Sequence, residues 1–257
     1  MLFDTHAHLN EEAFAEDLEE VLIRAQEAGV SYIANMGYDL PSSRRAVEIA
    51  KAHSCCYAAV GIHPQDADTV TAETYEELKK LLQGPKVVAV GEIGLDYYRD
   101  PTPKDLQQAV FREQIQIAKE FKLPISIHDR DAHGDILQII KEEQAGEYGG
   151  ILHCFSGSWE MAKVCINSGF YISLAGPVTF KNARRLQEIA PKIPLDHLLL
   201  ETDCPYLAPE PYRGKRNETA YVAEIAKFVA DLRQMDWEEL AEITSSNAKR
   251  VFRLGLL

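Results

Sequence analysis

Histidine and carboxylate side chains recur at or just after the ends of short apolar runs in this 257-residue sequence. His6 and His8 stand two residues apart directly after a short apolar run, so in an extended strand both side chains would share one face. Four further residues of these types follow or end other apolar runs: Glu92, His128, His153 and Asp203. Imidazole and carboxylate groups together suit zinc, manganese and related divalent ions. We therefore predict that these six side chains form one metal site.

The size of this ligand set indicates two metal ions. A catalytic zinc takes three protein ligands and keeps one position open, so six ligands are too many for a single ion. They suit two ions that share a bridging carboxylate. Two ions about 3.5–4 Å apart can hold an attacking water and stabilise both the attacking and the leaving oxygen of a displacement at phosphorus. The pattern therefore favours a hydrolase.

Eight apolar or β-branched runs predict the strands that would position these side chains. The predicted strands are Leu2–Thr5, Tyr32–Met36, Tyr57–Ile62, Val87–Ile93, Pro124–His128, Gly150–His153, Phe170–Leu174 and His197–Thr202. Segments with helical periodicity alternate with them: Phe14–Ala25, Ser42–Ala52, Glu73–Leu82, a helix between Pro103 and Pro124, Asp135–Glu143, Glu160–Asn167, Asn182–Ile189, Ala220–Leu232 and Trp237–Phe252. This alternation predicts a parallel sheet. Eight repeats favour a single-domain (β/α)8 TIM barrel over residues 1–257. The alternative is a doubly wound sheet, but no G-x-G-x-x-G motif follows a strand.

The six candidate ligands fall at the C-terminal ends of the predicted strands. The active site of a (β/α)8 barrel is built at that face from several strand ends. Three other histidines lie away from the C-terminal ends of the predicted strands, and we expect them to have ordinary structural roles: His53, His133 and His197. The placement of the ligands therefore agrees with the fold and with a catalytic site.

Charge and cysteine content exclude several classes of protein. A net charge of −13 argues against capture of long nucleic acid by broad electrostatic attraction, although it leaves nucleic acid open as a substrate. The five cysteines show no C-x-x-C spacing, which argues against a disulfide framework and fits the cytoplasm. No apolar run reaches the about 20 residues needed to cross a bilayer. We expect no cleaved leader, because the candidate ligands begin at His6.

Five motifs are spread over the sequence: Asp4-Thr5-His6-Ala7-His8-Leu9, Gly61-Ile62-His63-Pro64, Gly91-Glu92-Ile93-Gly94-Leu95-Asp96-Tyr97, Leu152-His153-Cys154-Phe155-Ser156-Gly157 and Leu200-Glu201-Thr202-Asp203-Cys204-Pro205-Tyr206-Leu207. Together they resemble the TatD family of metal-dependent deoxyribonucleases, which belongs to the amidohydrolase superfamily. The resemblance covers essentially the whole chain. It implies hydrolysis of DNA phosphodiester bonds, often as a 3′–5′ exonuclease on single strands. It also implies two divalent ions per subunit, with magnesium or manganese supporting activity and zinc as a further occupant.

The resemblance implies a role for each candidate ligand. His6, His8 and Asp203 would bind one ion, Glu92 would bridge, and His128 and His153 would complete the other. Catalysis would rest on Glu92 and on Asp203, which is placed to orient the attacking water or take its proton. Glu201 shares a pleat face with Asp203 and is a candidate supporting partner. One departure stands out, because the family commonly reads Asn-Glu-Pro where this chain has Asn217-Glu218-Thr219; we expect a local change without loss of function.

Substrate contacts are expected beside the metals. His63 ends a predicted strand without a second ligand nearby in the sequence, and we count it among the substrate-binding candidates. Basic and polar side chains that could hold flanking phosphates are Arg130, Arg213, Lys215, Arg216 and Asn217. The alternative for these is a solvated charged loop. Tyr97, Tyr98 and Phe155 could stack on bases or pack against the barrel rim. The expected partner is DNA with single-stranded ends, without a membrane or an obligate protein partner.

Two other functions stay open on the sequence alone. The first is a barrel metallohydrolase that acts on another ester or amide, such as a phosphotriester, a lactone or a cyclic amide, because the metal site does not distinguish these from DNA. The second is a non-catalytic barrel that keeps its metals for structural reasons. The complete ligand set argues against the second.

Overall fold

The computed structural model describes residues 1–98 and 102–255, and its centre is one sheet of eight parallel strands. The strands are β1 (Leu2–Ala7), β2 (Val30–Met36), β3 (Cys56–Val60), β4 (Val87–Asp96), β5 (Ile125–Arg130), β6 (Gly150–Leu152), β7 (Phe170–Leu174) and β8 (Leu198–Leu200). Their order in space is their order along the chain. A parallel bridge between Ala7 and Cys204 joins the last strand segment to the first. The sheet therefore closes into a single-domain (β/α)8 barrel, as predicted.

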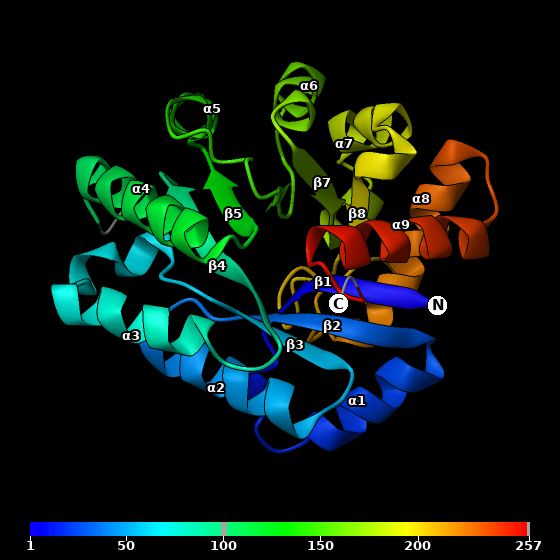
Figure 1. The fold of residues 1–257 in the computed structure, drawn as a ribbon. Coiled ribbons are helices and arrows are strands. Elements are labelled where there is room, and N and C mark those ends of the chain that lie inside the picture. Colours follow the sequence, from blue (N-terminus) through cyan, green and yellow to red (C-terminus); the bar gives the residue numbers. More distant parts are fainter. Residues whose placement is uncertain (99–101, 256–257) are drawn as a thin grey trace.

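Helices surround the strands on the outside (Figure 1). The α-helices of the described residues are α1 (Leu18–Glu27), α2 (Leu40–Ala52), α3 (Ala72–Leu82), α4 (Lys104–Phe121), α5 (His133–Glu142), α6 (Trp159–Asn167), α7 (Arg184–Ile189), α8 (Val222–Arg233) and α9 (Trp237–Val251). Short 3₁₀ helices are η1 (Glu12–Phe14), η2 (Pro64–Thr69), η3 (Gly176–Thr179), η4 (Ala190–Lys192), η5 (Leu195–His197) and η6 (Thr219–Tyr221). Local sequence sets several helix starts. Asp39 and Thr71, for example, accept hydrogen bonds from the backbone N–H of the first turns of α2 and α3.

The two ends of the barrel differ in character. At the end where the strands begin, apolar side chains such as Phe3, Val88 and Leu199 form a cluster with Phe252, which follows α9. The rings of Phe3 and Phe252 lie 5.6 Å apart, so the chain after α9 covers this end. Buried polar side chains instead gather where the strands finish. The opening of the barrel that can hold a site is therefore the C-terminal end of the strands.

The strand ends differ from the predicted ones in ways that matter for the site. β4 continues to Asp96 because its pairing with β5 continues through Gly94↔His128 to Asp96↔Arg130. β6 and β8 stop at Leu152 and Leu200, so the side chains that follow stand in turns. Among the described residues, no helix has both the length and the apolar character needed to cross a membrane.

Candidate metal centre

The structure brings the six predicted ligands together at the open end of the barrel. The strands β1, β4 and β5 contain His6, Glu92 and His128, respectively. The turns after β1, β6 and β8 contain His8, His153 and Asp203, respectively. A pocket of about 510 Å³ opens at this point, and all of the ligands except His6 line it. His6 is fully buried. Residues almost 200 positions apart in the sequence thus share one site.

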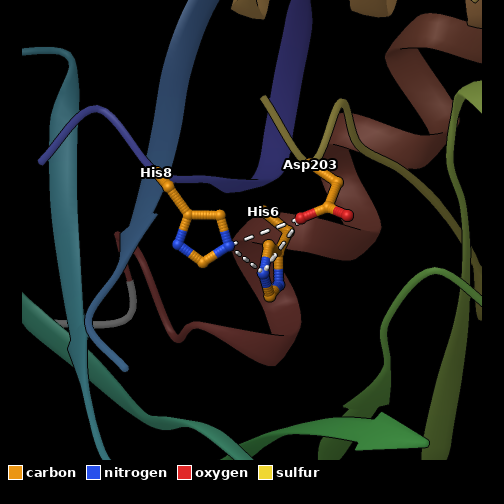
Figure 2. Close-up of side chains that lie close together, drawn as sticks. All are labelled: His6, His8 and Asp203. Carbon is orange, nitrogen blue, oxygen red and sulfur yellow. Dashed lines mark hydrogen bonds and ion pairs between the residues drawn. The ribbon is translucent and has the colours of Figure 1, made fainter. Parts of the chain in front are cut away.

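His6, His8, Asp203 and one oxygen of Glu92 form the first group of donor atoms. The His6 and His8 Nε2 atoms are 3.2 Å apart, and His8 Nε2 lies 3.4 Å from Asp203 Oδ1. Glu92 Oε2 lies 3.4 Å from His6 Nε2 and 3.5 Å from His8 Nε2. Figure 2 shows both rings turned toward the Asp203 carboxylate. Ligands about 2.0–2.1 Å from a tetrahedral zinc stand roughly 3.3 Å from one another, so this group has the spacing of a coordination shell.

The other oxygen of Glu92 belongs to a second group. Glu92 Oε1 lies 2.8 Å from His128 Nδ1 and 2.8 Å from His153 Nε2, and these two nitrogens are 3.3 Å apart. The two oxygens of one carboxylate therefore face two separate sets of imidazole nitrogens. A carboxylate placed in this way can bridge two ions.

Neighbouring acceptors hold the outer nitrogens of the histidine rings. His8 Nδ1 lies 3.2 Å from the Met36 carbonyl oxygen, and His128 Nε2 lies 3.2 Å from Asp96 Oδ2. His153 Nδ1 lies 3.2 Å from Glu201 Oε1, which is the kind of supporting contact expected for Glu201. A histidine that binds a metal usually donates its other N–H to such an acceptor. These contacts leave the inward nitrogens as lone-pair donors, so the residues present fit divalent ions.

The site keeps its carboxylates ionised in spite of burial. Burial acts to raise the pKa of Glu92, but the neighbouring His153 and His6 and the contact with His128 outweigh it and hold the pKa well below its usual value. Burial likewise acts to raise the pKa of Asp203, but the hydrogen bond with His8 and the neighbouring His153 and His6 together outweigh it, so that this pKa is also lowered. Two ionised carboxylates in one buried site favour cations.

The backbone around the candidate ligands restricts which residue types can stand at two positions. A Cβ atom at Gly94 would lie 2.0 Å from the His128 carbonyl oxygen, so only glycine allows β4 and β5 to approach at this point. Asp203 has a φ of 58°, a left-handed conformation that aspartate tolerates better than most residues. The turn after β8 therefore aims the Asp203 side chain back toward His8.

Asp4 is a site residue that the predictions missed. Its buried carboxylate accepts hydrogen bonds from the Thr202 N–H at 2.9 Å, the Thr202 hydroxyl at 2.6 Å and the Thr219 hydroxyl at 2.6 Å. Burial raises the pKa of Asp4 to about 7. It joins β1, which carries His6, to the turn that carries Asp203. Its sequence signal is an acidic residue inside a short buried strand, two positions before His6.

Thr219 explains the departure from the Asn-Glu-Pro pattern. Its hydroxyl donates to Asp4 and its side chain is fully buried. A proline at this position has no hydroxyl and could not make this bond. Thr219 therefore adds a hydrogen bond to the support of the site.

The predicted substrate-binding residues separate into two groups. His63 and Arg130 line the pocket. The others do not line it: Arg213 lies over the Phe180 ring at 4.1 Å, Lys215 lies 6.0 Å from the Tyr212 ring centre, and Arg216 pairs with Asp17. Asn217 is fully buried, and its amide donates to the carbonyl oxygens of Thr202 and Tyr206. Asn217 was expected to contact a phosphate, but its buried amide instead stabilises the turn after β8.

The remaining aromatic and histidine candidates are placed as follows. Tyr97 donates its hydroxyl to Asp135 and Phe155 is almost fully buried, so both pack within the barrel rim. Tyr98 is 62% exposed, and the Arg130 guanidinium lies 4.1 Å from its ring centre. His53, His133 and His197 do not line the pocket. The pocket residues Glu11 and Tyr38 carried no signal in the sequence, since single acidic or aromatic residues in loops are common, and Tyr206 was marked only as part of the last family motif.

Comparison with known proteins places this site in a family. The sequence matches the family model described as "TatD related DNase" over residues 3–253. The chain belongs to the TatD family. A TatD homologue from Escherichia coli K12, YjjV, has a crystal structure that superposes with a TM-score of 0.93 at 31% identity and covers 98% of each chain.

Two sequence relatives add names to the family. The metal-dependent hydrolase YabD of Bacillus subtilis (strain 168) is 53% identical over 99% of this chain and 100% of its own length. A protein of Citrobacter koseri named "3'-5' ssDNA/RNA exonuclease TatD" is 37% identical over 99% of this chain and 100% of its own length. As a TatD family member, the protein is a metal-dependent hydrolase.

Proposed function

We propose that the protein hydrolyses phosphodiester bonds at the 3′ end of single-stranded DNA, with two divalent ions at the site. His6, His8 and Asp203 would hold one ion, His128 and His153 the other, and Glu92 both. The observation that carries this proposal is the position of Glu92, whose two oxygens each lie 2.8–3.5 Å from the nitrogens of a different histidine pair. When bound, the ions would stabilise charge on the phosphate oxygens and lower the pKa of the attacking water.

The chain's own residues supply positioning and proton transfer. Asp203, whose lowered pKa keeps it ionised, is placed to orient the attacking water or accept its proton. His63 Nδ1 accepts a hydrogen bond from the Gln65 N–H, so the proton of the neutral ring is on Nε2. Nε2 lies 3.7 Å from Glu92 Oε1 and faces the site. His63 would therefore donate to a phosphate oxygen of the substrate.

Nucleic acid is favoured over small esters by the surroundings of the pocket and by one relative. Arg130 provides a cation for a flanking phosphate, and the exposed rings of Tyr98 and Tyr206 offer flat faces for bases. The Citrobacter koseri relative carries the name of a single-strand exonuclease. We propose magnesium or manganese as the working ions and zinc as a further occupant. The cytoplasm stays our prediction for the location, on the cysteine pattern.

An assay of purified protein against several substrates tests this function. The substrates are labelled single-stranded DNA, single-stranded RNA, duplex DNA, bis(p-nitrophenyl) phosphate and a lactone. We expect the single-stranded DNA to be shortened stepwise from its 3′ end with magnesium or manganese, and all cleavage to stop after chelation and return with added metal. Faster turnover of the lactone than of any phosphodiester would contradict the proposal. It would favour a barrel hydrolase of another ester.

A further inference from the structure

The two sides of the pocket differ in charge. Glu11, Tyr38 and Tyr206 line one side and come from the segments after β1, β2 and β8. Arg130 lines the other side and ends β5. Asp96 of β4 is paired with it in register and also lines the pocket, but its carboxylate is engaged by His128 Nε2 at 3.2 Å. Because the strands follow chain order around a closed barrel of eight, β5 stands opposite β1. A substrate that crosses the metal centre would therefore meet acidic groups without a lysine or arginine at one end, and Arg130 beside the histidine-paired Asp96 at the other.

The acidic side is a built surface beside the first ligand group. The Tyr206 hydroxyl donates to Glu11 Oε1 at 2.9 Å. The rings of Tyr38 and Tyr206 stand edge-on to the His8 ring, with centres 5.8 and 6.1 Å away. These contacts fix the Glu11 carboxylate close to a metal ligand. Tyr206 is 51% exposed, which leaves one face open for a base or sugar.

Asp66 adds a second acidic group to this side. It lies in η2 after β3, and it lines the same pocket. Burial raises its pKa, and the negative charges of the nearby Asp39 and Asp68 add to this effect. Tyr38 lies close to both Glu11 and Asp66, whose charges help to raise its pKa. Among the described residues that line the pocket, Arg130 is the lone lysine or arginine.

We propose that the acidic side receives an uncharged terminal nucleoside, so that the enzyme prefers strands ending in a hydroxyl group over strands ending in a phosphate, with Glu11 as the specificity-determining residue. This inference rests on the proposed function. The scissile phosphate lies over the metal centre, and the next phosphate of the strand lies toward Arg130. A terminal hydroxyl group can donate to the Glu11 carboxylate. A terminal phosphate at the same place would bring up to two negative charges against Glu11 and Asp66.

First-cut rates on paired oligonucleotides test the proposal. The first pair of single-stranded DNAs differs only at the 3′ end, which carries a hydroxyl in one strand and a phosphate in the other. The second pair differs in the same way at the 5′ end. Comparing the two pairs identifies which end of the strand enters the pocket. At the entering end we expect the hydroxyl form to be cut about ten-fold faster or more, the size of a like-charge contact in a partly shielded site. Phosphorylation of the other end should change the rate little.

Charge-removing variants assign the preference to Glu11. In Glu11→Gln the amide oxygen can still accept from Tyr206, but the charge is gone, and we expect the rate ratio to fall to within about three-fold of unity. Asp66→Asn should lower the ratio less and serves as a second test if Glu11→Gln folds poorly. Glu12→Gln removes the same charge from an exposed neighbour outside the pocket and should keep the wild-type ratio.

The outcomes separate the two proposals. Cleavage of both forms at equal rates by the wild type, or an unchanged ratio in both Glu11→Gln and Asp66→Asn, overturns the acidic-side inference and leaves the nuclease function standing. An equal loss of preference in Glu12→Gln also overturns it, because the effect would then come from net charge. If the wild type cuts no oligonucleotide with any metal, the proposed function fails, and this inference fails with it.

Discussion

Glu92 is the residue on which the arrangement of the site depends. Its side chain is only 5% exposed, and its two oxygens face two different histidine pairs. The surrounding imidazoles make the ionised carboxylate the stable form before any metal arrives. A shorter or neutral side chain here would separate or weaken both groups at once.

Replacing one histidine of the second group tests the ligand assignment. We expect His153→Ala to lose about one of two bound metal equivalents and to reduce turnover by at least about 100-fold, because Glu92 Oε1 loses one of its two close imidazole partners. Metal content is measured by elemental analysis and folding by circular dichroism. The matched control is His133→Ala, since His133 lies outside the pocket and contacts Asp129. Full metal content and activity in His153→Ala would refute the assignment.

At the scale of elements, the segment between β8 and α8 holds the site together. Asn217 fastens it to the turn after Thr202, and Glu218 forms a paired ion contact with Arg24 of α1 at 2.7 Å. Thr219 reaches Asp4 in β1. The segment therefore joins the last strand to the first strand and to the first helix, and it supports the turn that carries Asp203.

Removing the Thr219 hydroxyl tests this support. Thr219→Val keeps the shape but leaves the Asp4 carboxylate with fewer donors, so we expect a loss of about 1–3 kcal/mol in the free energy of unfolding. We also expect weaker metal retention during dialysis against a chelator, because Asp4 also contacts Thr202 beside Asp203. Thr219→Ser keeps the hydroxyl and should stay close to the wild type in both measurements. Equal behaviour of the valine and serine variants would show that the hydrogen bond contributes nothing.

At the scale of the whole molecule, we expect metal binding and folding to be coupled. The six ligands come from β1, β4, β5 and the turns after β1, β6 and β8, so the unfolded chain cannot present them together. A ligand that binds only the folded state stabilises it by about 2.7 kcal/mol at 100 times its dissociation constant. For a chain of this size we expect the midpoint of thermal unfolding to rise by roughly 5–10 °C when metal is added to chelator-treated protein.

Calorimetry or circular dichroism with and without magnesium, manganese or zinc measures this shift. The His153→Ala variant is the internal comparison, and its shift should be smaller. A midpoint that does not move with any of the three metals would contradict the coupling.

The barrel, and the meeting of the six candidate ligands at one end of it, could be predicted because both follow from local patterns. Strand and helix alternation set the fold, and ligands such as His6 and Glu92 end or follow apolar runs whose ends must meet. The contacts of the long segment after β8 could not be predicted, because no periodicity fixes its path. Arg216 therefore turns out to pair with Asp17, and Asn217 to be buried. The role of Asp4 depends on partners about 200 residues away, which no local pattern reveals.

The bridge between Ala7 and Cys204 has a consequence for how the protein is made. Synthesis on the ribosome delivers His6 and His8 first and Asp203 only after four-fifths of the chain has been assembled. A growing polypeptide therefore lacks a complete set of donor groups until its final quarter emerges. We therefore expect hydrolase activity to arise only late in synthesis, once these donor groups can meet.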